Sequence, residues 1–222
     1  MTQHQLTHYA PPKGEIEIIH HDDNLLVVSK PSGLLSVPGK GEKFSDCLTS
    51  RVRDIDTEAL LVHRLDMETS GIMVFARSKS VQRILGLQFE KRKTQKIYIA
   101  RVSGQISTDT GEIDLPLITD WPNRPRQKVN FEDGKSSLTK WRVLDFEEDN
   151  NVTRVELIPH TGRTHQLRVH MKEIGHPILG DSLYAPENIR NAADRLQLHA
   201  QSLIIHNPEN GELMTFSDPC PF

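Results

Sequence analysis

The sequence predicts a mixed α+β fold, with a largely antiparallel central β-sheet and flanking helices. Short apolar runs of strand length recur between turn residues, whereas three other segments carry apolar residues at helical spacing. With 222 residues, of which 36% are hydrophobic and 26% charged, the composition is that of a globular domain. We therefore expect a single folded domain over residues 15–222, preceded by a disordered tail over residues 1–14.

The first half of the chain contains two apolar runs broken by "HDDN", which is typical of a hairpin. Farther on, the apolar run "IMVFA" has the length and composition of a buried strand. The elements expected here are, in order, a hairpin over 15–33, a helix over 43–55 capped by Ser45, a strand over 71–78 and a helix over 81–93 capped by Ser78 or Ser80.

The second half alternates apolar and polar residues in several segments, which indicates strands. One segment, "THQLRVHMKEIGHP", instead has Leu167, Met171 and Ile174 at helical spacing, followed by Gly175 where a helix commonly ends. The elements expected here are strands over 96–104, 138–146 and 152–158, a short helix capped by Thr164, and two final strands joined at "NPENG".

The net charge is −3, but the basic residues are clustered. Between residues 77 and 101 eight Lys and Arg residues accompany a single acidic residue, and "DWPNRPRQKV" forms a second basic cluster. An overall acidic chain with a basic face can still bind phosphate locally. The chain has only two cysteines, far apart, and a polar start without an apolar signal segment. We therefore expect a cytoplasmic protein without disulfides and without a membrane segment.

Common catalytic and cofactor motifs are missing from the sequence. The three histidines at 160, 165 and 170 recur every five residues, which is neither HExxH nor the spacing of one helix face. There is no GxSxG nucleophile motif, no GxxxxGK[ST] phosphate loop and no GxGxxG dinucleotide motif. We expect no metal, no nucleotide and no other cofactor.

The stretch "HRLDMETSG" at 63–71 is unusual for a turn, because Arg64 and Asp66 flank an apolar Leu65 immediately before a buried strand. A half-buried carboxylate needs a positive partner to remain ionised. If the segment is extended, Arg64 points away from Asp66. Arg163 and Arg168, in a second Arg-bearing segment, are then the candidate partners of Asp66.

Four motifs, in order, resemble those of the RluA-type pseudouridine synthases. They are "VVSKPSGLLSVPG", "HRLDMETSGIMVFARS", "KIYIARVSG" and "PHTGRTHQLRVHMKEIGHPILGD". The segment "DLPLITDWPNRPRQKV" is similar to the branch of this family that modifies both 23S rRNA and a tRNA anticodon stem-loop. The resemblance runs from about residue 15 to the C-terminus, and it implies the pseudouridine synthase fold.

The resemblance implies an isomerase that converts uridine to pseudouridine in structured RNA without a metal or cofactor. Asp66 is then the catalytic carboxylate, acting as a nucleophile at C1′ or as a base on the ribose. Tyr98 is the aromatic residue against the target base, and Arg168 is the ion-pair partner that keeps the carboxylate ionised.

A uridine in a folded loop has to be flipped out before such chemistry. We expect Arg64 to fill the vacated stack or to clamp the adjacent phosphate, because a guanidinium can stack on bases. His63 contacts the RNA backbone or only caps its loop. The residues expected to bind RNA are His63, Arg64, Lys96, Arg124, Arg126, Lys128, Arg163 and His165.

Two alternatives remain open at this level, and a third is disfavoured. The enzyme could act on only one of the two RNAs, or the chain could be a non-catalytic RNA-binding relative. A glycoside hydrolase using Asp66 and Glu68 is disfavoured, because two carboxylates two residues apart on a strand do not face each other across a bond. We expect a monomer whose partners are the RNA substrates.

Overall fold

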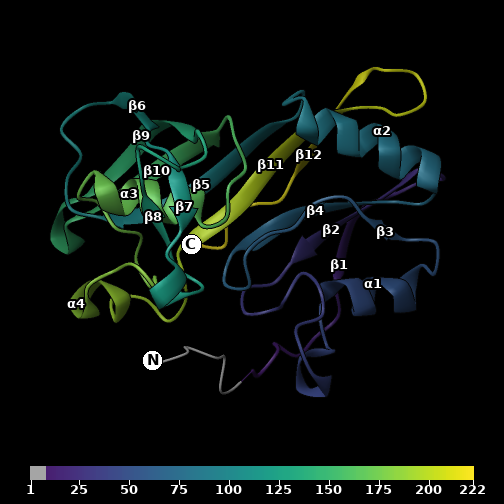
Figure 1. Cartoon of the computed structure of the whole chain (residues 1–222), viewed down its shortest axis with the longest axis horizontal. Helices are drawn as coiled ribbons and strands as arrows, with labels where there is room; N and C mark the ends of the chain where they lie inside the picture. Colours follow the sequence, from purple (N-terminus) through teal and green to yellow (C-terminus); the bar gives the residue numbers. More distant parts are fainter. Residues whose placement is uncertain (1–8) are drawn as a thin grey trace. The chain divides into compact units, whose positions relative to one another are not determined.

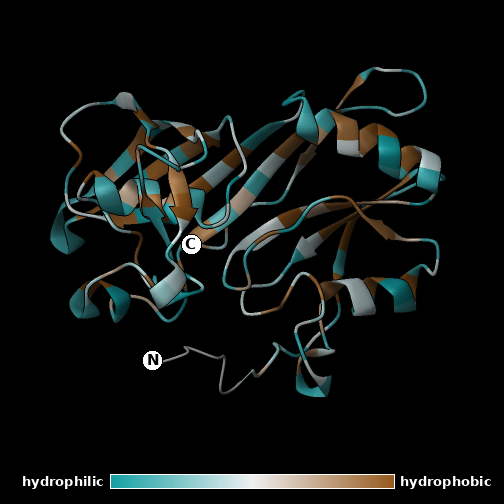
Figure 2. Ribbon diagram, viewed as in Figure 1, coloured by the Kyte–Doolittle hydropathy of each residue, from teal (hydrophilic) through white to brown (hydrophobic). Residues whose placement is uncertain are grey.

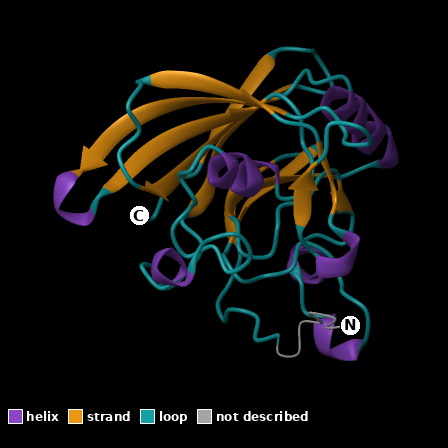
Figure 3. Ribbon diagram, turned by 60° about the vertical axis from the view of Figure 1, so that its left-hand side comes forward, coloured by secondary structure: helices purple, strands orange, loops and turns teal. Residues whose placement is uncertain are grey.

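The computed structural model describes residues 9–222 and divides them into two compact units. The terminal unit comprises Tyr9–Lys96 and His199–Phe222, and the central unit comprises Ile97–Leu198. Within the described residues, strands predominate over short helices (Figure 3). Residues 1–8 of the predicted tail lie outside the described residues. The mixed α+β class with mostly antiparallel pairing is confirmed.

The terminal unit is built on strands in the order β1-β2-β4-β11, with β3 paired to β4 and β12 to β11 (Figure 1). All pairs are antiparallel except β4 with β11, which run parallel. Its elements are β1 (Glu17–His21), β2 (Leu25–Lys30), α1 (Leu48–Ile55), β3 (Leu60–Leu61), β4 (Ser70–Ala76), α2 (Lys79–Glu90), β11 (Leu198–His206) and β12 (Leu213–Ser217). The predicted hairpins, the buried strand and both helices of this unit are therefore confirmed.

Two helix starts in this unit test the predicted caps. Ser78 caps α2 as predicted, since its hydroxyl accepts the backbone N–H of Val81 at 3.2 Å. The cap predicted at Ser45 is wrong, because Cys47 is the N-cap of α1 and Ser45 ends a preceding 3-10 turn. The hydroxyl of Ser50 accepts the N–H of Cys47 at 3.0 Å, so the helix supplies its own cap from its first turn.

The core of the terminal unit lies between its sheet and α2. Figure 2 shows brown and teal segments alternating along α2, as expected for a helix with one apolar face. Every residue of β4 is buried. At Gly71, which has φ 114°, a Cβ atom would lie 2.3 Å from the carbonyl oxygen of Ala200. Only glycine permits this close pairing of β4 with β11.

The central unit has an antiparallel sheet in the order β5-β10-β9-β6 and a separate hairpin, β7–β8. Its elements are β5 (Gln95–Ser103), β6 (Thr110–Asp114), β7 (Leu117–Thr119), β8 (Gln127–Val129), β9 (Leu138–Glu147), β10 (Val152–Pro159), α3 (Gln166–Glu173) and α4 (Glu187–Arg190). The predictions for β5, β9, β10 and α3 are confirmed. β6, β7, β8 and α4 were not predicted, because they are three to five residues long and too short for a periodicity.

Helix α3 starts one residue later than predicted. His165, not Thr164, is its N-cap, and His165 adopts the left-handed conformation with φ 54°. Gly175 follows the last turn with φ 89°, as predicted for a helix end. The apolar side of α3 packs in a cluster with β5 and β10 that includes Leu167, Met171 and Leu157. Within residues 9–222, no helix combines the length and the apolar character that a bilayer crossing requires.

Candidate active site

Asp66 lies in a loop of the terminal unit that directly precedes β4. The loop turns back on itself, because the carbonyl of Asp66 accepts the N–H of Thr69 at 3.2 Å. Lys30, a fully buried lysine at the end of β2, donates from Nζ to the carbonyl of Met67 at 2.9 Å. The same ammonium group donates to the carbonyls of Pro31 and Leu34. Lys30 therefore joins the Asp66 loop to the segment that follows β2.

Two serines of the same segment fix the loop on either side of Asp66. The hydroxyl of Ser36 donates to the carbonyl of Leu65 at 2.6 Å and accepts its N–H at 3.2 Å. The hydroxyl of Ser32 donates to the carbonyl of Glu68, also at 2.6 Å. These contacts hold the backbone before and after Asp66, so the position of its Cα is determined by segment 30–36. Such support is what a precisely placed catalytic group requires.

His63 is integrated into the terminal unit. Its Nε2 atom accepts the backbone N–H of Val74 at 3.1 Å, and its ring stacks on Phe89 at a centroid distance of 4.6 Å. Burial, together with the positive charge of Lys96, lowers the pKa of His63 to about 3. The ring is therefore neutral at physiological pH, with Nε2 as the acceptor. This placement favours the capping alternative for His63 over contact with RNA phosphate.

Two cations of the terminal unit are available to a ligand. Arg64 is exposed, and within residues 9–222 it has no hydrogen-bond or ion-pair partner. Lys96 is partly buried, and burial lowers its pKa. Within the same described range Lys96 has no carboxylate partner either. Both residues were expected to bind RNA, and an RNA phosphate would supply the missing counter-charge.

Arg168 is held on α3 of the central unit by a buried ion pair. Its Nε and Nη2 atoms donate to the two carboxylate oxygens of Asp181 at 2.9 and 2.6 Å. The side chains of Arg168 and Asp181 are 2% and 1% exposed. The carboxylate of Asp181 also accepts the N–H groups of Leu183 and Tyr184. The bidentate contact thus fixes the plane of the guanidinium. Proteins use this geometry to orient an arginine toward a further ligand.

Tyr184 connects this pair to the β7–β8 hairpin. The guanidinium carbon of Arg168 lies 5.4 Å from the centroid of the Tyr184 ring. The hydroxyl of Tyr184 accepts the N–H of Gln127, the first residue of β8, at 2.7 Å. It also forms a 2.7 Å hydrogen bond with Nδ1 of His165. The predicted site residues Arg168 and His165 are therefore brought together, with the hairpin beside them.

Tyr98 and Arg163 occupy other positions in the central unit. Tyr98 lies in β5 opposite Leu157 and packs, half-buried, against the apolar cluster that contains residues of α3. Arg163 is exposed before α3, and its Nε donates to the carbonyl of Ser136 at 3.3 Å. Its side chain is therefore positioned at the surface, where a phosphate can reach it.

The tip of the β7–β8 hairpin carries the second basic cluster, and Arg124, Arg126 and Lys128 are all exposed. The described residues offer no carboxylate partner to Arg124 or Arg126, whereas Lys128 lies 3.8 Å from Asp120. Trp121 was not predicted to have a role. It is 65% exposed, and the guanidinium of Arg124 lies over its ring at 4.4 Å.

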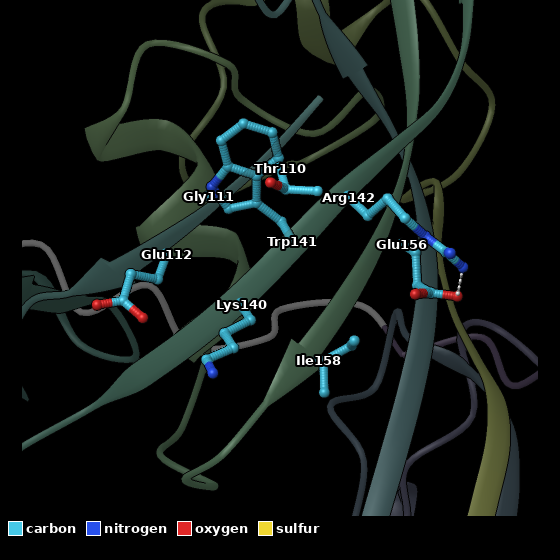
Figure 4. A pocket seen from close by; sticks show the side chains of 8 residues that line it. All are labelled: Thr110, Gly111, Glu112, Lys140, Trp141, Arg142, Glu156 and Ile158. Atoms are coloured by element: carbon cyan, nitrogen blue, oxygen red, sulfur yellow. Dashed lines mark hydrogen bonds and ion pairs between the residues drawn. The ribbon is translucent and has the colours of Figure 1, made fainter. Parts of the chain in front are cut away.

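A shallow surface pocket of ≈ 480 Å³ also lies in the central unit, on β6, β9 and β10 (Figure 4). Arg142 and Glu156 form an ion pair along its wall, at 3.1 Å. Gly111 gives space to Trp141, since a Cβ atom at this glycine would lie 2.4 Å from the indole. None of the predicted site residues lines this pocket, so it is separate from the candidate active site.

Three supporting residues, Lys30, Asp181 and Tyr184, were not predicted. Lys30 and Asp181 are within the motifs "VVSKPSGLLSVPG" and "HPILGD", and Tyr184 follows the second of these. The sequence does contain one signal that these residues have a structural role. Lys30 and Asp181 are charged residues inside otherwise apolar motifs, and a buried charge needs dedicated partners. The sequence does not show which partners these are.

Comparison with known proteins identifies the family. Residues 24–173 match the model of the RNA pseudouridylate synthase family. The chain is 50% identical over 218 residues to the dual-specificity RNA pseudouridine synthase RluA of Vibrio cholerae, covering 98% of this chain and 88% of the relative. It is 49% identical to RluA of Escherichia coli strain K12, covering 98% and 99%.

Similar solved structures indicate the same family. Human RNA pseudouridylate synthase domain containing 1 is similar with a TM-score of 0.79 and 29% identity, covering 96% of this chain and 87% of that one. Human RNA pseudouridylate synthase domain containing 4 has a TM-score of 0.72 and 26% identity, covering 92% and 88%. With the motif around Asp66 and the supported Arg168, these matches show that the chain belongs to the RNA pseudouridylate synthase family.

Proposed function

We propose that this chain isomerises uridine to pseudouridine in both 23S rRNA and a tRNA anticodon stem-loop. One observation carries the dual specificity: the match to RluA of Escherichia coli, named a dual-specificity enzyme, covers 98% of this chain and 99% of the relative. We also propose that the enzyme works as a monomer in the cytoplasm. The proposed isomerisation is redox-neutral and adds no atom, so it requires no external donor of electrons or groups.

The proposed reaction assigns one task to each of three residues. The bond between N1 and C1′ breaks, C1′ joins C5, the hydrogen of C5 leaves as a proton, and N1 gains one. Asp66 acts on the ribose as an ionised carboxylate, and Arg168 supplies the positive charge that favours this ionised form. Tyr98 presents a flat ring to the uracil and a hydroxyl for proton transfer.

RNA binding is assigned to three cations that have no carboxylate partner among residues 9–222. Arg64 fills the space left by the flipped uridine, since a guanidinium can stack between bases. Lys96 and Arg163 contact phosphates and thereby position the stem-loop. We assign His63 to support of the Asp66 loop, because its ring is occupied by Val74 and Phe89.

The test is tritium release from C5 of labelled uridine, measured separately on 23S rRNA and on a tRNA pool. Forming the C1′–C5 bond expels the C5 hydrogen, so the label reports isomerisation and not hydrolysis. We expect the wild type to release tritium from both RNAs. Asp66→Asn should abolish release from both, because an amide can neither attack C1′ nor take a ribose proton.

Glu68→Gln is the matched control, since it removes a carboxylate two residues away in the same loop. It should retain release from both RNAs. Release from only one RNA would refute the dual specificity but keep the isomerase. If Asp66→Asn, folded and binding RNA, released tritium at the wild-type rate, the assignment of Asp66 would be wrong.

A further inference from the structure

The tip of the β7–β8 hairpin combines an exposed aromatic ring with unpaired positive charge. Trp121 is 65% exposed, although an indole is among the most hydrophobic surfaces a protein can present. The guanidinium of Arg124 covers one face of the ring at 4.4 Å. The exposed fraction leaves the other face open to solvent. An exposed aromatic ring beside cations is the arrangement with which proteins stack unpaired nucleic-acid bases.

Backbone contacts hold this tip in one conformation. The N–H of Asp120 donates to the carbonyl of Arg126 at 2.9 Å, and the N–H of Asn123 donates to the carbonyl of Asp120 at the same distance. The side chain of Asn123 also donates to the carboxylate of Asp120 at 2.8 Å. With Arg124 over its ring, the indole of Trp121 is ordered before a ligand arrives, which reduces the entropic cost of binding.

The tip is also joined to the candidate catalytic residues of the central unit. β8 begins at Gln127, whose N–H donates to the hydroxyl of Tyr184, and the ring of Tyr184 lies against the guanidinium of Arg168. The hairpin that carries Trp121 is therefore linked to Arg168 through Tyr184.

We propose that Trp121 and Arg124 form a stacking platform for an unpaired loop base of the RNA substrate, distinct from the flipped uridine. Arg126 supplies a charge for a flanking phosphate. This inference rests on the proposed function. Stacking is tolerant of base identity, so one platform serves loops of different sequence, and it thereby explains how a single chain accepts both rRNA and tRNA.

The kinetic test measures tritium release by Trp121→Ala and Trp121→Phe on each RNA. Trp121→Ala should lower kcat/KM about tenfold on both RNAs, mainly through KM, because loss of a stacked base weakens binding by that order. Trp121→Phe should restore most of the loss. Phe131→Ala is the matched control: Phe131 is 77% exposed and lies just after β8, at the opposite end of this strand from the tip, where it precedes Glu132 and Asp133, which repel RNA. It should match the wild type.

A fluorescence titration tests the stacking itself. The chain has two tryptophans, and Trp141 is only 8% exposed. RNA stem-loops should quench the emission of the wild type and leave Trp121→Phe unchanged, although that variant still binds. The proposal is overturned by wild-type kcat/KM in Trp121→Ala, by a loss on one RNA alone, or by wild-type emission that saturating RNA does not quench. If the wild type released no tritium at all, the proposed isomerase activity would be refuted. The fluorescence titration would still show whether Trp121 stacks on RNA.

Discussion

The ammonium group of Lys30 lies 2.9 Å from the carbonyl oxygen of Met67, the residue that follows Asp66. Lys30 is fully buried and donates its three hydrogen bonds to backbone carbonyls, two of them in its own segment. A buried charge without such partners would be very unfavourable. The segment around Lys30, which is part of the motif "VVSKPSGLLSVPG", therefore supports the loop that carries Asp66, the candidate catalytic carboxylate.

Lys30→Met tests this support. The substitution keeps most of the apolar stem but leaves three carbonyls without their donor, so the free energy of unfolding should fall by roughly 3 kcal/mol. Urea unfolding measures the loss, and kcat for tritium release at low temperature should also fall. Lys172→Met, which removes an exposed lysine paired with Glu173, should change the unfolding free energy by less than about 0.5 kcal/mol. Equal effects of the two variants would contradict the role of Lys30.

The ion pair of Arg168 with Asp181 gives a second prediction. Asp181→Asn keeps one acceptor oxygen but removes the charge that compensates a buried guanidinium. We expect a loss of about 3–5 kcal/mol in unfolding free energy, as for other broken buried pairs. Glu156→Gln breaks the more exposed pair with Arg142 and should cost at most about 1 kcal/mol. Thermal and urea unfolding of both variants measure the difference, and a small effect of Asp181→Asn would show that the pair is not structurally important.

The sequence predicted the long elements of this fold and missed the short ones. β4 is long enough to be recognised from its continuous apolar run and α2 from its apolar periodicity, whereas β7 and β8 have only three residues each. The helix start was misplaced because His165, a residue type that rarely caps a helix, occupies the N-cap with a left-handed backbone, whereas the preceding Thr164 is a common capping residue. The family resemblance indicated Asp66 and Arg168 as candidate site residues but not their supports, because hydrogen bonds between remote segments leave no local periodicity.

His63 makes the stability of the protein depend on pH. Its pKa falls from 6.5 to about 3 on folding, because burial penalises the charged ring and the positive charge of Lys96 adds to this effect. Above pH 6.5 His63 is neutral in both the folded and the unfolded chain, so its native contact contributes fully to the stability of the fold. Between pH 6.5 and pH 3 only the unfolded chain is protonated, so stability falls by about 1.4 kcal/mol for each pH unit.

His63→Gln removes this dependence, because the amide oxygen can accept the same N–H but does not titrate. The variant should therefore lose less stability than the wild type between pH 6.5 and 5, as measured by urea unfolding at each pH. In the wild type, the NMR signals of the His63 ring should keep their neutral positions down to about pH 4. Titration of that ring near pH 6.5 would contradict the burial argument.

The hydroxyl of Tyr184 gives the last prediction. It accepts the N–H of Gln127 at 2.7 Å and hydrogen-bonds Nδ1 of His165, so it joins the β7–β8 hairpin to the start of α3. Tyr184→Phe removes both contacts but keeps the ring against Arg168. We expect a loss of about 1–2 kcal/mol in unfolding free energy and faster hydrogen exchange at the amide of Gln127.

Tyr9→Phe is a matched control for this change. The hydroxyl of Tyr9 also makes two hydrogen bonds, in this case in the terminal unit: it donates to the carbonyl of Asp46 and accepts the N–H of Leu35. Its loss should lower stability by a similar amount and leave exchange at Gln127 unchanged. If Tyr184→Phe also left that exchange unchanged, the hairpin would be held by its own backbone bonds alone. Because Tyr184 connects Arg168 to the hairpin, faster exchange at Gln127 should be accompanied by a higher KM for both RNAs.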